Sequence, residues 1–115
     1  MAKRPTNNQE DQQDERVIKA IASADRRRIL DLLREEPQTT GALCEQLPWL
    51  NRCTVMQHLG VLENAELVIS RKEGRSRWNY LDVGPIQRFH ERWIKLYAQP
   101  SADMLGRLKH DLETA

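Results

Sequence analysis

The free face of one predicted helix gathers polar side chains that donate and accept hydrogen bonds. In the stretch from residue 52 to residue 62, Val55, Leu59 and Leu62 recur at helical spacing, which predicts a helix with one apolar face. The side chains left on the opposite face are Arg52, Thr54, Gln57 and His58. Such groups can hydrogen-bond to base edges, and a short helix fits the major groove of DNA. We therefore take these four residues as candidate DNA contacts.

A shorter helix is predicted just before this one. Ala42, Leu43 and Leu47 give residues 39–47 an apolar stripe that can pack on the stripe of the following helix. Pro48 ends the first helix because its ring clashes with the preceding turn, and Asn51 is a suitable N-cap for the second. The pattern predicts a helix-turn-helix, although two amphipathic helices joined by a turn also occur in all-helical proteins without DNA partners.

A basic hairpin follows and favours nucleic acid as the partner. The segments Leu67–Arg71 and Arg77–Leu81 are predicted strands, separated by a turn that contains Gly74. The hairpin has one acidic residue near its tip, Glu73, and four cations, which are Arg71, Lys72, Arg75 and Arg77. Cations on both sides of a hairpin tip can contact a phosphate backbone or enter a minor groove. A helix-turn-helix followed by a basic hairpin predicts a winged helix.

Two helices are expected before this motif. Residues 1–13 have no large apolar residue after Met1, so we predict a disordered tail there. A short helix should span Asp14 to Ala22, and another should start after Ser23 or Asp25 as its N-cap and end near residue 36. Three arginines, at positions 26–28, open that second helix and oppose its dipole, and we interpret them as a solvated face. Residues 14–84 form the predicted DNA-binding domain.

The C-terminal part, residues 85–115, is predicted to be a helical dimerisation segment. A helix opening at Pro85 carries a broad apolar stripe, Pro100 is expected to interrupt it, and Met104, Leu105 and Leu108 continue at helical spacing. We expect this segment to pair with a second copy, together with the first helix. The predicted interface residues are Val17, Ile21, Phe89, Trp93, Ile94 and Tyr97. The alternative is that the segment folds back over its own domain.

Composition narrows the class of protein. A chain of 115 residues with 39% hydrophobic and 30% charged residues indicates a single mainly α (α+β) domain. A net charge of +1 fits a protein that touches phosphate with one face only. The chain has neither a membrane-length apolar run nor a signal-peptide pattern, which predicts a cytoplasmic protein with reduced cysteines. It lacks a glycine-rich phosphate loop and hydrolase motifs, so we expect no enzyme.

Several motifs in this order resemble the ArsR-type winged-helix transcriptional regulators of bacteria. The similar segments, within about residues 17–82, are Asp25–Leu33, Thr54–Leu62, Ala65–Val68 and Gly74–Leu81. The resemblance implies a homodimer that binds a palindromic operator in double-stranded DNA and usually represses transcription. It implies recognition helices in successive major grooves and wings over the flanking backbone. The stretch from Trp93 to Tyr97, with Leu105 and Leu108, is similar to a branch whose members often lack metal ligands.

The sequence departs from the family pattern at several positions. Met56 stands where members usually have a serine that reaches DNA, Glu66 stands where they usually have glycine, and the loop at residues 48–51 is one residue longer than usual. Metal-sensing members carry Cys-x-Cys before the turn, whereas this helix has only Cys44.

Two alternatives to a simple repressor stay open. The first is a thiol- or metal-responsive regulator that uses Cys44 and Cys53, with His58 as an imaginable third metal ligand. The spacing of these residues is unlike that of usual metal sites. We therefore expect no metal or other cofactor. The second alternative is a winged helix that serves as a protein-interaction module without specific DNA binding.

Overall fold

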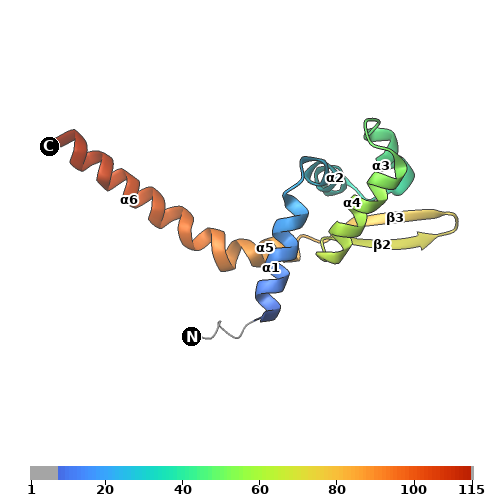
Figure 1. Ribbon diagram of the computed structural model, residues 1–115, viewed down its shortest axis with the longest axis horizontal. Coiled ribbons are helices and arrows are strands. Elements are labelled where there is room, and N and C mark those ends of the chain that lie inside the picture. Colours follow the sequence, from blue (N-terminus) through green and yellow to red (C-terminus); the bar gives the residue numbers. More distant parts are fainter. Residues whose placement is uncertain (1–7, 115) are drawn as a thin grey trace. The chain divides into compact units, whose positions relative to one another are not determined.

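The structure is a computed structural model that describes residues 8–114, where seven helical segments and three short strands follow one another (Figure 1). In chain order they are α1 (Asn8–Ile21), α2 (Ala24–Glu35), β1 (Gln38–Thr39), α3 (Thr40–Gln46), α4 (Arg52–Asn64), β2 (Val68–Glu73), β3 (Ser76–Leu81), α5 (Gly84–Phe89), the π-helical turn η1 (His90–Ile94) and α6 (Lys95–Thr114). The chain divides into two compact units after Pro85, and each unit is described by itself.

The first unit has the predicted helix-turn-helix at its centre. Leu43 of α3 and Val55 and Leu59 of α4 are fully or almost fully buried, so the two predicted apolar stripes do form core. The side chain of Asn51 accepts a hydrogen bond from the Thr54 N–H at 2.8 Å, which confirms the predicted N-cap. The helix before the turn ends at Gln46, two residues before Pro48, as expected. These contacts fix the direction of α4.

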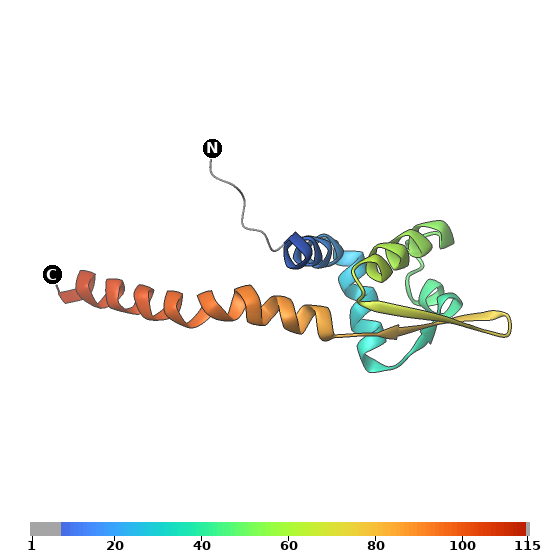
Figure 2. The ribbon, with the colours of Figure 1, turned by 90° about the horizontal axis from the view of Figure 1, so that it is seen from below.

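The wing, the hairpin of β2 and β3, follows α4 directly. Gly74 lies at its tip with φ of +63°, a left-handed conformation that glycine adopts without steric cost. Figure 2 shows the hairpin projecting beyond α3 and α4. The sheet has a third strand that the sequence did not predict: β1 pairs with β3, which gives the antiparallel order β1-β3-β2. The two residues of β1 are too few to show an alternating pattern.

Helix α1 begins earlier than predicted. It starts at Asn8 rather than Asp14, so residues 8–13 are helical and do not belong to a disordered tail; residues 1–7 lie outside the described range. Glu10 and Asp11 in the first turn complement the positive end of the helix dipole. The Gln13 side chain donates a hydrogen bond to the Ala65 carbonyl at 3.1 Å, which attaches this extension to the end of α4.

The sequence suggested that the arginines that open α2 form a solvated face, but two of them hydrogen-bond to the end of α1. Arg26 donates hydrogen bonds to the carbonyls of Lys19 and Ala20, both at 2.8 Å, and Arg27 donates to the carbonyl of Ile21 at 2.6 Å. These carbonyls end α1 and have no partner within that helix. The cations therefore satisfy the C-terminal groups of α1, where the helix dipole favours positive charge.

The second unit is helical from Ile86 to Thr114, with the π-helical turn between α5 and α6. The prediction that Pro100 interrupts this segment is wrong, because α6 continues through that position to Thr114. Proline removes one hydrogen bond from a helix, and a helix can survive that loss when good helix formers surround it. No helix in the described part of the chain is both long and apolar enough to span a membrane.

Candidate nucleic-acid interface

The outward face of α4, here called the recognition helix, carries the first group of candidate DNA contacts. Arg52 and Gln57 are exposed, while Thr54 and His58 are half-buried. Within residues 8–114, neither the Arg52 nor the Gln57 side chain hydrogen-bonds to another residue, so both are free to meet a ligand. Met56, at the position usually held by serine, is 37% exposed between them.

His58 differs from the other three because it has a partner inside the protein. Its Nδ1 atom lies 3.2 Å from Nη1 of Arg26, the residue that also caps α1. The recognition helix is thus tied to the junction of α1 and α2 through one guanidinium group. The sequence showed the arginine cluster but not this contact, which joins residues 32 positions apart.

The wing distributes its cations over both faces. Lys72 pairs with Arg77 across the hairpin and Arg71 pairs with Trp78, so alternation of side chains puts Arg71 on the face opposite Lys72 and Arg77. A shallow hollow of about 420 Å³ on the wing is lined by Ser70, Lys72, Arg75 and Arg77. Three of the four predicted wing cations therefore line one hollow, and such a concentration of positive charge suits an anionic ligand.

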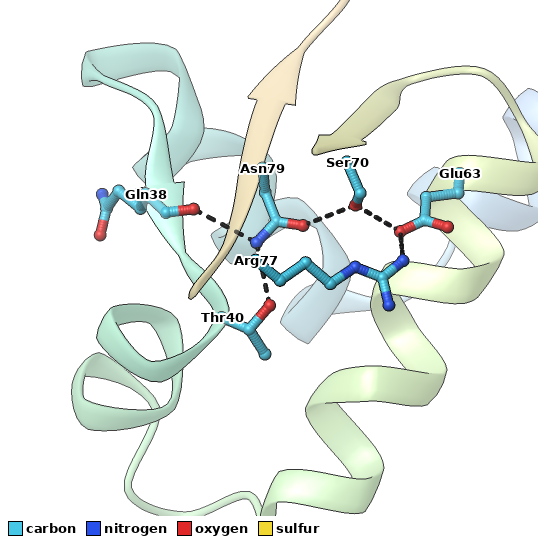
Figure 3. Close-up of polar contacts among 6 residues, drawn as sticks. All are labelled: Gln38, Thr40, Glu63, Ser70, Arg77 and Asn79. Atoms are coloured by element: carbon cyan, nitrogen blue, oxygen red, sulfur yellow. Dashed lines mark hydrogen bonds and ion pairs between the residues drawn. The ribbon is translucent and has the colours of Figure 1, made fainter. Parts of the chain in front are cut away.

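Arg77 also links the wing to the recognition helix. Its Nη2 atom lies 2.6 Å from Oε1 of Glu63 in the last turns of α4, and the Ser70 hydroxyl lies 2.6 Å from the same carboxylate oxygen (Figure 3). The Arg77 side chain is 40% exposed, so part of it remains open to solvent. Arg77 has a structural role that the sequence reasoning missed, because Glu63 lies 14 residues away in the chain.

A buried amide continues this network to β1. Asn79 is fully buried, and its Nδ2 atom donates to the Gln38 carbonyl at 3.2 Å and to the Thr40 hydroxyl at 3.1 Å (Figure 3). Its Oδ1 atom lies 2.9 Å from the Ser70 hydroxyl, whose single hydrogen can serve only Asn79 or Glu63 at one time. The network holds β1, β3, β2 and α4 in register.

The loop between α3 and α4 is held by an aromatic side chain. Trp49 donates from Nε1 to Oδ1 of Asp25 at 2.9 Å, and the guanidinium carbon of Arg28 lies 5.4 Å from the centre of the Trp49 ring. Both partners come from α2. A tryptophan inside a loop that is one residue longer than usual was the only signal for this contact in the sequence.

The predicted interface residues have very different exposures. Val17 is fully buried in the core of the first unit, and Phe89 is only 6% exposed, so these two side chains leave little surface for a second copy. The phase of the α1 stripe explains Val17: it faces inward with Ala20, while Ile18 faces solvent. Ile21 is half-buried.

The exposed apolar residues of the second unit extend along η1 and α6. Trp93 and Tyr97 are 56% and 58% exposed, and Ile94 is also exposed. Phe89, Trp93 and Tyr97 form a row of rings, with centroids 6.0 Å and 5.5 Å apart. Further large apolar side chains exposed on α6 are Leu96, Met104, Leu105, Leu108 and Leu112.

Comparison with known proteins identifies the family. A family model described as a helix-turn-helix domain matches residues 21–71. HTH-type transcriptional regulator Rv2034 of Mycobacterium tuberculosis is 36% identical over 92 residues, which cover 74% of this chain and 85% of the relative. A solved homodimeric winged helix-turn-helix DNA-binding domain, Mb0332 from Mycobacterium bovis, described as a possible ArsR-family regulator, is 26% identical, with a TM-score of 0.62 and coverage of 96% of this chain and 95% of that one. The chain belongs to the ArsR-type helix-turn-helix transcriptional regulators.

Membership of this family of DNA-binding transcriptional regulators confirms the predicted fold and the predicted class of function. The transcriptional repressor SdpR of Bacillus subtilis is a further relative, 31% identical over 71 residues that cover 62% of this chain and 78% of the repressor.

Glu66, one of the departures from the family pattern, has a strained backbone conformation. Glu66 follows the C-cap of α4 with φ of +62°, the left-handed region in which a side chain is strained. Glycine adopts this conformation without that penalty, which explains why a glycine would suit this position. The Glu66 N–H still donates to the Glu63 carbonyl at 2.9 Å, so the end of the helix is closed as a glycine would close it.

The two cysteines do not meet in a metal site. Cys44 is half-buried in α3, Cys53 is exposed in the first turn of α4, and both are free thiols. Among the described residues, no group of three or more His, Cys, Asp or Glu side chains is placed to hold a metal ion.

Proposed function

We propose that the protein is a homodimeric repressor that binds a palindromic operator. Each recognition helix enters a major groove with Arg52, Thr54, Gln57 and His58, and each wing contacts the flanking backbone or minor groove with Arg71, Lys72, Arg75 and Arg77. The homodimeric Mb0332 domain and the repressor SdpR support the oligomeric state and the direction of regulation. The proposed partner is DNA, and we expect the protein to regulate transcription in the cytoplasm rather than to act as an enzyme.

One observation carries this proposal: the recognition helix and the basic wing are joined to each other. The ion pair of Arg77 with Glu63 connects the hairpin to the end of α4. A helix that contacts bases and a hairpin that contacts phosphates must keep a fixed spacing to match one DNA site. A winged helix that only binds proteins does not need cations around a hairpin tip.

The second copy is expected to pack on the exposed apolar stripe of η1 and α6. Trp93, Tyr97, Leu108 and Leu112 leave more than half of their surfaces exposed. A row of large apolar side chains along one helix is costly in water and is characteristic of helix pairing between subunits. The proposed interface comprises Ile21, Trp93, Ile94, Tyr97 and the apolar residues of α6, with Val17 and Phe89 beneath it because they expose little surface of their own.

Binding to duplex DNA at two salt concentrations separates this function from the protein-interaction alternative. A regulator that neutralises several phosphates loses affinity steeply as salt rises, because binding releases counterions. The wild-type protein should show this loss and should retain preference for its own operator over random duplex at both concentrations. Salt-insensitive binding, or the absence of binding, would favour the interaction module.

A further inference from the structure

The contact between Arg26 and His58 carries a consequence for how DNA is recognised. We infer that Arg26 is a positioning residue that holds His58 as a neutral hydrogen-bond donor, with its proton on Nε2 and directed to an acceptor on a DNA base. This inference rests on the proposed DNA-binding function, and it adds the chemical class of base that position 58 accepts.

The tautomer follows from the partner. Nη1 of Arg26 lies 3.2 Å from Nδ1 of His58. A guanidinium group has five N–H donors, no acceptor, and does not lose its proton in proteins. A hydrogen bond between these atoms therefore requires Nδ1 to be the unprotonated acceptor. In a neutral imidazole the single proton then resides on Nε2.

The C-terminal carbonyls of α1 hold the Arg26 side chain in place. Its Nε atom donates to the Ala20 carbonyl and its Nη2 atom donates to the Lys19 carbonyl, both at 2.8 Å. All three guanidinium nitrogens thus form hydrogen bonds at the same time, two with the end of α1 and one with His58. A planar group with three such partners has little freedom to turn away, so His58 keeps one ring orientation.

The other ring nitrogen is available to a ligand. His58 is half-buried, and Nδ1 makes the one hydrogen bond of this side chain to another described residue. No buried side-chain nitrogen in the described part of the chain lacks a hydrogen-bond partner. Nε2 has no protein partner, so solvent reaches it, and a DNA base can replace that solvent.

An Nε2–H donor discriminates between bases. In the major groove guanine offers the acceptors N7 and O6, adenine offers N7 and thymine offers O4, whereas cytosine presents a donor. A donor fixed by Arg26 matches the first three bases and rejects cytosine, since two donors would face each other. The expected site preference at this position is therefore a base with an acceptor, and guanine satisfies it best.

The tautomer can be measured without DNA. Nitrogen-15 NMR of the full-length protein in slightly alkaline buffer should show His58 protonated at Nε2 and bare at Nδ1. Arg26→Gln should reduce this bias to the mixture of tautomers that a free imidazole shows, because an amide can donate or accept, and Arg26→Lys should retain it. Arg27→Gln is the matched control: it removes the equivalent cap from Ile21 without touching His58, and should leave the tautomer unchanged.

A proton on Nδ1 in the wild-type protein would overturn the inference, and so would an unchanged tautomer in folded Arg26→Gln. If Arg26→Gln does not fold, the wild-type spectrum can still overturn the inference, and Arg26→Lys takes the place of the glutamine variant: a fully Nε2-protonated His58 is expected there, and a mixture of tautomers would contradict the inference.

The DNA contact is tested by two substitutions of His58 on a selected operator. Glutamine can place an amide N–H near the position of Nε2, whereas asparagine can only offer its oxygen to Arg26. His58→Gln should retain the discrimination against cytosine, and His58→Asn should lose about tenfold of it. Equal discrimination in wild type and His58→Asn would refute the contact. Failure of the wild-type protein to prefer any operator would refute the proposed function instead, and would leave the tautomer result standing.

Discussion

Arg77 of the wing and Glu63 of the recognition helix form an ion pair with 2.6 Å between Nη2 and Oε1. The pair joins the element proposed to contact phosphates to the element proposed to contact bases. Its side chains are 40% and 30% exposed, so solvent screens the charges in part and the contribution to stability is modest. The larger effect is expected on the position of the wing.

Glu63→Ala should lower the free energy of unfolding by about 1 kcal/mol, because it removes the ion pair and a hydrogen bond to Ser70. Urea unfolding at a fixed protein concentration measures this change. Glu73→Ala at the wing tip is the matched control, since Glu73 makes no ion pair within residues 8–114. Equal stabilities of the two variants would show that the pair contributes nothing.

Glu66→Gly should stabilise the protein by about 0.5–1 kcal/mol, because relief of the left-handed strain exceeds the added freedom of the unfolded chain. Thermal unfolding at one concentration checks it. The control is Glu73→Gly, where β2 is extended and glycine should destabilise. A destabilising Glu66→Gly would mean that the carboxylate or the β-carbon has a role that outweighs the strain.

Asn79→Ala should cost about 2–3 kcal/mol, because it leaves the Gln38 carbonyl and the Thr40 hydroxyl without their buried partner. Thr40→Val should cost less, since Asn79 keeps its bond to Gln38. A double-mutant cycle gives the coupling between the two side chains. Additive losses would show that the network does not act as a unit.

The wing and the recognition helix should respond differently to alanine. Arg75→Ala should weaken binding to every duplex and reduce the salt slope by about one, because one phosphate contact is lost. Gln57→Ala should mainly reduce the preference for the operator over random DNA. Titrations of both variants on both DNAs at several salt concentrations test this division. Identical effects on specific and random DNA would refute it.

Leu108→Glu should convert the dimer to a monomer, because the exposed stripe of α6 would then carry a charge into the proposed interface. His110→Glu introduces the same carboxylate two residues away, on the other side of the helix, and should leave the dimer intact. Sedimentation equilibrium measures both. A dimeric Leu108→Glu variant would place the interface elsewhere.

Local signals in the sequence were sufficient for the elements around the turn. Asn51, Pro48 and the spacing of Val55 and Leu59 predicted α3, α4 and their boundary, because caps, breakers and periodicity act over a few residues. The hairpin was predicted for the same reason, from Gly74 and alternating side chains.

Contacts between distant segments could not be predicted in this way. The hydrogen bond from Gln13 to Ala65, which supports the early start of α1, joins residues that are 52 positions apart in the sequence. The hydrogen bond from Asn79 to Gln38 joins residues that are 41 positions apart. Neither has a local pattern. Neighbouring apolar residues on α1 left the phase of its stripe ambiguous, and only packing shows that Val17 faces the core while Ile18 faces solvent.

Selection of bound fragments from randomised duplex DNA tests the central claim most directly. Two recognition helices related by a two-fold axis should enrich a two-fold symmetric site whose half-sites are about one helical turn apart. The enrichment should persist when salt is raised and should be weaker with Gln57→Ala. Absence of any enriched sequence, with only weak binding at low salt, would contradict a sequence-specific dimeric regulator.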